Sequence, residues 1–178
     1  MSASELKIES AAAEQMAETI FGEGVKIVSA SFTGADGQVG IYSGADETMP
    51  GVAPSDRGLI LSTGRVSDFT RSEGDANISE GTSTNFAGRG DDMLSRVSGQ
   101  TTFDAAVFEA SFVPTGDVLT MQIVWSSEEY LEYVNSGYND AFAVWVNDVP
   151  AELVLGAGSI SIDNINNCLL YTSPSPRD

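Results

Sequence analysis

The spacing of apolar residues along the chain changes at Gly22. Before this glycine, apolar side chains recur at three- and four-residue steps, which is typical of one face of a helix. We therefore predict that residues 2–22 form one amphipathic helix, with Gly22 as its C-terminal stop. The apolar positions are Leu6, Ile8, Ala12, Ala13, Met16, Ala17, Ile20 and Phe21.

After Gly22, β-branched and alternating apolar residues separated by turn residues predict strands. The predicted strands cover residues 25–34, 37–44, 58–64, 103–113, 118–125, 140–147, 152–155 and 159–163. In 118–125, one face carries Leu119, Met121, Ile123 and Trp125, and the opposite face carries Thr120 and Gln122. Such alternation is expected of a strand with one buried face.

Turn residues predict which strands are neighbours. Residues 37–44 are predicted to form a short partner strand for 25–34, joined through Ala35-Asp36-Gly37. The Pro-Thr-Gly-Asp sequence between 103–113 and 118–125 is typical of a hairpin turn.

Short strands at this spacing predict an all-β fold. We expect a β-sandwich, jelly-roll-like, with the N-terminal amphipathic helix packed at one edge. The predicted domain organisation is a helix over 1–22 and a sandwich over 23–167. Residues 65–100 are mostly polar, which is long for a structureless loop inside a compact domain.

The last eleven residues, CLLYTSPSPRD, differ in composition and pattern from the rest of the chain. Back-translated, they match a transposase adapter used in sequencing libraries, read in one frame. We therefore expect Cys168 to Asp178 to be a non-native tail. On this interpretation the natural sequence continues past Asn167 and the chain is a fragment, truncated at its C-terminus.

The charge of the chain narrows the classes of partner. Acidic residues outnumber basic ones 26 to 8 over 178 residues, giving a formal net charge of −18. Such a field repels phosphate backbones and anionic lipid, so we expect neither nucleic-acid binding nor membrane-surface binding. It suits surroundings rich in divalent cations, where Ca²⁺ neutralises Asp and Glu.

Targeting signals are not evident in the sequence. No window approaches the roughly 20 apolar residues of a membrane-spanning helix, so no membrane insertion is expected within this fragment. The N-terminus carries acidic residues early and lacks a positive region followed by an apolar one, which argues against a Sec-type signal peptide. If the protein is exported, its signal is expected in the missing C-terminal region.

The chain has no histidine and one cysteine, Cys168. Without histidine, Ser-His-Asp catalysis, Cys-His catalysis and the usual transition-metal sites are excluded. Because Cys168 lies in the tail assigned to the adapter, the natural part has no thiol for a disulfide or a cysteine-based zinc site.

Six oxygen-bearing side chains are candidate ligands for a hard cation. They are Asp91 and Asp92 in GRGDDML, Glu128 and Glu129 in SSEEY, and Asn139 and Asp140 in GYNDAF. Ca²⁺ takes six to eight oxygen ligands, which loops of this composition supply. The spacing is not that of an EF-hand, so Ca²⁺ is a hypothesis from composition. The alternative is structural: Glu128 and Asp140 cap turns or pair with Arg89 or Arg96.

A catalytic interpretation of the same carboxylates is also open. Glycosidases use two carboxyl groups about 5 to 9.5 Å apart. Glu128 and Glu129 are neighbours and would point to opposite faces of an extended chain, so they cannot form that pair. Glu129 with Asp140 could, if the loop between them folds back. Nothing in the sequence identifies an acid with a raised pKa, which favours a non-catalytic role.

The whole pattern resembles the choice-of-anchor L domain family of bacterial secreted and surface proteins. The segment centred on SEEY, EYV and YNDAF is the most distinctive. The resembling segments are 58-GLILSTG-64, 90-GDDML-94, 103-FDAAVFEASFVPTGDVL-119, 126-SSEEYLEYVNSGYNDAFAVWV-146 and 159-SISIDNIN-166. The resemblance implies an exported protein with a variable C-terminal anchoring module, and it implies no catalytic activity.

These observations predict a non-catalytic extracellular or surface module for interaction or adhesion, with Ca²⁺ as its stabilising ion. An extracellular protein or a carbohydrate is the expected partner, and Tyr130, Tyr133 and Tyr138 offer aromatic contacts for either. A carbohydrate-active enzyme using Glu129 and Asp140, and a ligand-free structural spacer, are the alternatives.

Overall fold

The computed structural model describes residues 6–70, 84–127, 133–151 and 158–165. Most of its regular elements are short antiparallel strands, with few helices. The chain divides into two compact units: the first contains residues 1–88 and 104–124, and the second contains residues 89–103 and 125–178. The predicted β-rich class is confirmed, whereas the β-sandwich and the predicted domain boundaries stay predictions.

A three-stranded antiparallel sheet in the first unit has the order β1-β3-β4. Its strands are β1 (Lys7–Glu9), β3 (Val39–Ser43) and β4 (Arg57–Leu61). Ile41 of the central strand is buried. Tyr42 lies opposite Gly58, and its ring fills the space that a side chain at Gly58 would need. Glycine at this position therefore allows the tyrosine to cover β4.

The second sheet of this unit is a long antiparallel ribbon of β2 (Val25–Thr33) and β5 (Val107–Pro114). Phe32 lies opposite Phe108, and Ile27 lies opposite Phe112. The register shifts at Val28, which has no opposite residue and is exposed, as in a β-bulge. One face of the ribbon is half-buried and apolar, and the other is exposed.

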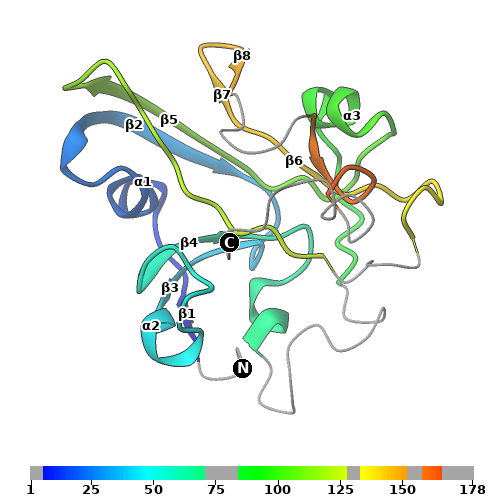
Figure 1. Cartoon of the computed structure of the whole chain (residues 1–178), viewed down its shortest axis with the longest axis horizontal. Coiled ribbons are helices and arrows are strands. Elements are labelled where there is room, and N and C mark those ends of the chain that lie inside the picture. Colours follow the sequence, from blue (N-terminus) through cyan, green and yellow to red (C-terminus); the bar gives the residue numbers. More distant parts are fainter. Residues whose placement is uncertain (1–5, 71–83, 128–132, 152–157, 166–178) are drawn as a thin grey trace, which may run out of the picture. The chain divides into compact units, whose positions relative to one another are not determined.

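Helix α1 (Ala13–Phe21) contacts both sheets of the first unit. It packs against β2 of the ribbon and against β3 and β4, and Figure 1 shows it between the two sheets. Met16 and Ala17 are buried. The ring centroid of Phe21 lies 4.7 Å from that of Phe112 on β5. The helix therefore supplies apolar contacts to both sheets.

The predicted start of the N-terminal helix is wrong. Residues Lys7–Glu9 form β1, and the helix begins at Ala13. Ile8 lies opposite Tyr42 in the sheet, while Lys7 is exposed, so the local alternation suits an edge strand. The side chain of Gln15 accepts a hydrogen bond from the Ala12 N–H at 3.2 Å, which stabilises the first turn where the helix begins.

The strand positions predicted before residue 115 agree with β2, β3, β4 and β5, but the predicted pairings are wrong. Strand β2 pairs with β5, which is far away in sequence, and β3 pairs with β1 and β4. The turn at Ala35-Asp36-Gly37 therefore carries the chain from one sheet to the other. Pairing depends on contacts between distant segments, which local turn chemistry does not specify.

Several predicted strands after residue 115 also differ from the structure. Residues 118–125 form no strand. The predicted strand 140–147 is split into β6 (Ala141–Phe142) and β7 (Trp145–Val146). Strand β9 (Ile160–Ser161) lies inside the predicted 159–163, and the predicted strand 152–155 lies outside the described residues.

The second unit contains helix α3 and two small antiparallel pairs. Helix α3 (Asp92–Ser98) contacts β6, and β6 pairs with β9. Strand β7 forms a hairpin with β8 (Val149–Pro150) through Asn147 and Asp148, both at positive φ, as a type I′ turn requires. Ile160 and Ile162 are buried in this unit.

Three shorter helical segments complete the described structure, all in the first unit. They are η2 (Gly22–Gly24), α2 (Ala45–Thr48) and η3 (Val66–Thr70). Segment η3 and helix α3 both lie within the mostly polar residues 65–100, for which the sequence pattern predicts no regular element.

Candidate functional site

Asp91 caps helix α3. Its Oδ1 accepts hydrogen bonds from the N–H groups of Met93 at 2.8 Å and of Leu94 at 2.9 Å. These N–H groups have no partner inside the helix, and an aspartate at this position satisfies them. Its negative charge also lies at the positive end of the helix dipole. The carboxylate therefore has a structural role at the start of the helix.

The same turn is fixed to a neighbouring segment through hydroxyl groups. The Asp91 N–H donates to Thr102 Oγ1 at 3.0 Å, and the Asp91 carbonyl accepts from Ser95 Oγ at 2.8 Å. The two hydroxyls lie 2.8 Å apart. A side chain at Gly90 would overlap the Thr102 carbonyl. The backbone of Asp91 is thus fixed where two chain segments approach closely.

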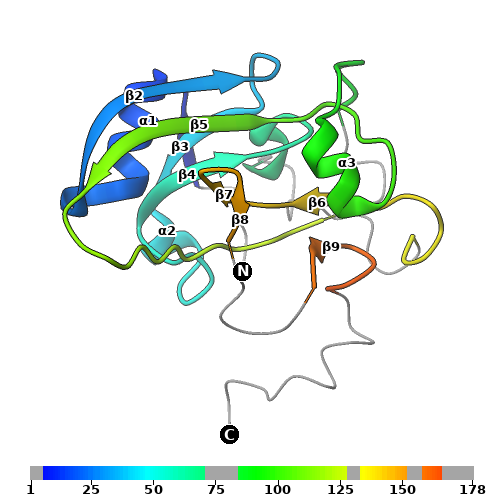
Figure 2. The same ribbon diagram turned by 90° about the horizontal axis from the view of Figure 1, so that it is seen from above.

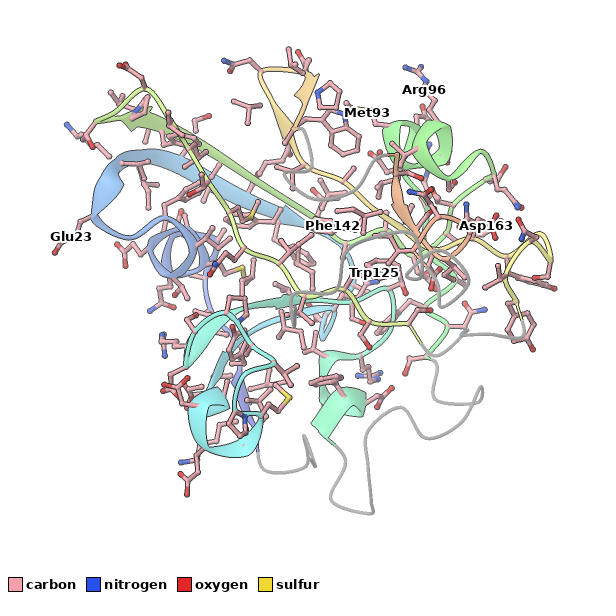
Figure 3. The ribbon with its side chains drawn as sticks, in the orientation of Figure 1. Glu23, Met93, Arg96, Trp125, Phe142 and Asp163 are labelled. Atoms are coloured by element: carbon pink, nitrogen blue, oxygen red, sulfur yellow. The ribbon has the colours of Figure 1, made fainter. Side chains whose placement is uncertain are left out.

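Asn139 joins two parts of the second unit. Its Nδ2 donates to the Ser98 carbonyl at the end of α3 at 2.8 Å, and its Oδ1 accepts from the Asp163 N–H at 3.0 Å. The Asp163 carboxylate in turn accepts from the Asn135 N–H at 2.6 Å. Figure 3 shows Arg96 extending outward from α3, away from Asp163. The amide of Asn139 is therefore used to connect backbone groups.

Asp92 and Asp140 are the other candidate ligands that the structure describes. Asp92 is exposed in the first turn of α3. The backbone carbonyl of Asp140 accepts from the Ile162 N–H at 3.2 Å. Glu128 and Glu129 lie outside the described residues.

Within the described ranges, no three acidic or cysteine side chains gather as a metal-binding group. The amide oxygen of Asn139 and one carboxylate oxygen of Asp91 already accept hydrogen bonds. These two residues therefore fit a structural role better than a ligand role. The predicted Ca²⁺ site includes Glu128 and Glu129 and stays a prediction.

A second polar cluster lies in the first unit, around the buried side chain of Gln38. Gln38 is only 1% exposed. Its Nε2 donates to the carbonyls of Thr63 at 2.8 Å and Asp104 at 2.7 Å. Its Oε1 accepts from the Ala35 N–H. One amide thus joins the turn after β2, the end of β4 and the segment before β5, with all its polar atoms paired.

Asp104 extends this cluster. Its Oδ2 accepts from the Phe86 N–H at 3.0 Å, and its Oδ1 accepts from the Gly88 N–H. Asp104 has a φ of 50°, a left-handed conformation that Asp and Asn adopt more readily than most residues. No pattern in the sequence marks Gln38 or Asp104, because the bonded partners are 66 residues apart.

Aromatic groups lie close together at one turn of the second unit. The rings of Tyr133 and Tyr138 make an edge-to-face contact with centroids 5.5 Å apart, and Tyr138 is exposed. Tyr130, the third predicted aromatic, lies outside the described residues. Two of the three tyrosines are therefore neighbours in a geometry that stabilises aromatic pairs.

Comparisons with known proteins identify the family. Residues 4–172 match the family model described as Choice-of-anchor L domain. The match covers most of the chain and runs past Cys168 into the tail assigned to the adapter. No curated protein and no solved structure matches the chain. Among the described residues, no helix is long and apolar enough to cross a membrane.

Proposed function

This chain belongs to the choice-of-anchor L domain family, a bacterial surface-associated and non-catalytic kind of domain, and on that premise we propose that it is an interaction or adhesion module of an exported protein. The resemblance seen in the sequence is confirmed by the family match. The family match supports a surface-associated domain, and adhesion is the step that the proposal adds.

The observation that carries the proposal is the use of the polar side chains. Asp91 and Asn139, two of the six residues predicted as ligands, bond to backbone groups within the second unit. Oxygen atoms that accept backbone N–H groups stabilise the local fold, and these two side chains hold turns in place. Such an arrangement suits a domain that presents a rigid surface.

The exposed ring of Tyr138 is the proposed contact for a carbohydrate or protein partner. Aromatic rings bury large areas at binding sites with little loss of conformational entropy. We expect Tyr138→Ala to weaken binding to a glycan array or to immobilised extracellular proteins by about tenfold or more. Phe103→Ala is the matched control, because Phe103 is also an exposed aromatic residue of the second unit.

Three outcomes would contradict this part of the proposal. Equal binding by wild type, Tyr138→Ala and Phe103→Ala would place the contact elsewhere. Binding to no glycan and no protein would favour the ligand-free spacer. Glycan hydrolysis by the wild type, reduced to background in Glu129→Gln, would favour the carbohydrate-active enzyme.

Stabilisation by Ca²⁺ is a second proposal, supported by the net charge of −18 and by the exposed carboxylate of Asp92 in the first turn of α3. Asp92 is the described residue on which it rests most directly. A ligand that binds only the folded chain raises the melting temperature. We expect millimolar Ca²⁺ to raise it by about 3 °C or more, and EDTA to reverse the rise.

Asp92→Asn should reduce this rise, because it removes one carboxylate. Glu23→Gln removes the same charge from an exposed residue of the first unit, which points outward in Figure 3, and should leave the rise unchanged. No response to Ca²⁺ would remove this proposal while leaving the adhesion proposal intact. Equal reductions in both variants would indicate a general charge effect rather than a site.

A further inference from the structure

Among the residues that the structure describes, no hydrogen bond joins residues 116–124 of the first unit to another segment, although the neighbouring Thr115 donates twice to Gly24. They follow β5 directly, and Figure 2 shows them as an extended coil. Their large apolar side chains are exposed, from 40% for Ile123 to 83% for Val118. The segment therefore leaves both backbone groups and apolar side chains open.

Residues 118–124, with the sequence VLTMQIV, have the composition of a strand. Five of the seven side chains are apolar, with polar residues at Thr120 and Gln122, and none is charged or proline. Proteins usually protect an open strand edge with a lysine, a proline or a covering element. This segment contains neither lysine nor proline, and its large apolar side chains are exposed, which is expected where an edge is used for pairing.

The sequence of the segment reads nearly the same in both directions around Met121. Two copies aligned antiparallel on Met121 place Val118 opposite Val124 and Leu119 opposite Ile123. Thr120 then lies opposite Gln122, so polar faces polar and apolar faces apolar. Cross-strand pairs of this kind stabilise sheets, and a two-fold axis requires such self-complementarity.

We infer that residues 118–124 pair with the same residues of a second copy of this chain, as antiparallel strands related by a two-fold axis through Met121. A shift of the register by two residues would place Val118 opposite Gln122 or Thr120 opposite Val124, which mixes polar with apolar pairs. The aligned register is therefore the favoured one. This inference goes beyond the proposed adhesion function and does not depend on it.

A strand has two edges, so residues 118–124 could pair with a different strand along each edge. The same residues could pair with β5 in their own chain, along the edge that does not face β2. That pairing would occupy one edge and leave the other edge for the second copy. Intramolecular pairing alone would give a monomer, so the oligomeric state distinguishes the two arrangements.

The charge of the chain predicts how the association responds to salt. Each copy carries a formal charge of −18, so two copies repel each other at low ionic strength. Raising the salt from about 50 mM to about 0.5 M shortens the screening length and should strengthen the dimer. A single strand pair is a small interface, so we expect weak association at about micromolar or higher concentrations.

Disulfide cross-linking tests the register. In a Cys168→Ser background, Met121→Cys places two thiols opposite each other, with Cα atoms about 4.5 to 5.5 Å apart, which suits a disulfide. Val118→Cys is the matched control, because its two copies would lie about 20 Å apart in the same register. We expect oxidised dimer from Met121→Cys, and at least about tenfold less from Val118→Cys at the same concentration.

Analytical ultracentrifugation tests the interface itself. Met121→Glu would place two carboxylates opposite each other and should weaken the dimer by tenfold or more in dissociation constant. Val52→Glu introduces the same charge at a site of similar exposure in the same unit, 45% against 48% for Met121, and should dissociate like the wild type.

Three results would overturn the inference. They are a monomer at every concentration and salt, equal cross-linking from both cysteine variants, and equal weakening by both glutamate variants. An assembly that grows without limit would also contradict it, because a two-fold pairing closes at two copies.

Discussion

Asp91 and Asp104 have the same hydrogen-bonding role over very different ranges of sequence. Each carboxylate accepts two backbone N–H groups. The donors of Asp91 lie two and three residues away, whereas those of Asp104 lie 18 and 16 residues away. One carboxylate therefore begins a short helix, and the other holds a distant segment against the start of β5.

The difference in range predicts a difference in energy. Loss of a helix cap removes one or two bonds from a single turn, which typically costs about 1 kcal/mol. Loss of a long-range bond also frees a chain segment whose position had been fixed against its conformational entropy. The Asp104 cluster includes the buried Gln38, so substitutions there should destabilise more than substitutions at Asp91.

The largest effect is expected at Gln38. Gln38→Ala leaves the Ala35 N–H and the carbonyls of Thr63 and Asp104 without the partner they have now, in a site that is 1% exposed. We expect the free energy of unfolding to fall by about 3 kcal/mol, measured by urea denaturation.

The matched control for Gln38→Ala is Gln122→Ala. Gln122 is an exposed glutamine of the same unit, and its side chain makes no hydrogen bond within the described part of the structure. Its replacement should change the stability by less than about 0.5 kcal/mol. A loss below about 1 kcal/mol for Gln38→Ala would show that the buried amide is not the connection described above.

A smaller effect is expected at Asp104. Asp104→Ala removes the acceptor of the Phe86 and Gly88 N–H groups and places alanine at a positive φ. We expect a loss of about 2 kcal/mol and amide hydrogen exchange at Phe86 and Gly88 that is faster by about tenfold or more.

Asp104→Asn separates these two causes. Asparagine tolerates the left-handed conformation and keeps one acceptor oxygen. The loss of unfolding free energy in Asp104→Asn should therefore be about half of that in Asp104→Ala. Unchanged exchange at Phe86 and Gly88 in either variant would contradict the long-range role of this carboxylate.

The sequence predicts local features of this fold better than distant ones. The ranges of β2 to β5 follow from β-branched and alternating residues, which act within each strand. The partner of β2 does not follow, because Phe32 and Phe108 meet only through the folded chain. For the same reason the hydrogen bonds from Gln38 to Thr63 and Asp104 have no signature in the sequence.

Ambiguous local patterns explain the other differences. Ile8 fits both the apolar face of a helix and the inward face of β1, and pairing with Tyr42 decides between them. Helix α3 has seven residues, too few for a clear helical period, although Asp91 is a typical cap for it. Residues 118–124 show the strand alternation without pairing to any described strand, so alternation predicts the capacity to pair rather than pairing itself.

The candidate site shows the same limit. Composition and position single out six oxygen-bearing residues, among them Asp91 and Asn139. The structure then shows that a hydrogen-bonding oxygen can be used by the backbone, as in the contacts of Asn139 with Ser98 and Asp163. A ligand and a cap are chemically alike in the sequence, and only their neighbours distinguish them.

The smallest expected effect provides the most direct measurement, because it separates a cap from a ligand. The measurement is the free energy of unfolding of Asp91→Ala, relative to the wild type, in excess EDTA and again in millimolar Ca²⁺. The exposed neighbour Asp92, replaced in Asp92→Ala, controls for the loss of one charge in the same turn.

If Asp91 serves the architecture of the domain, Asp91→Ala should lose about 1 kcal/mol in both solutions, and more than Asp92→Ala in EDTA. No loss in EDTA together with a clear loss in Ca²⁺ would show that Asp91 binds the ion instead, and would contradict the structural role assigned to it.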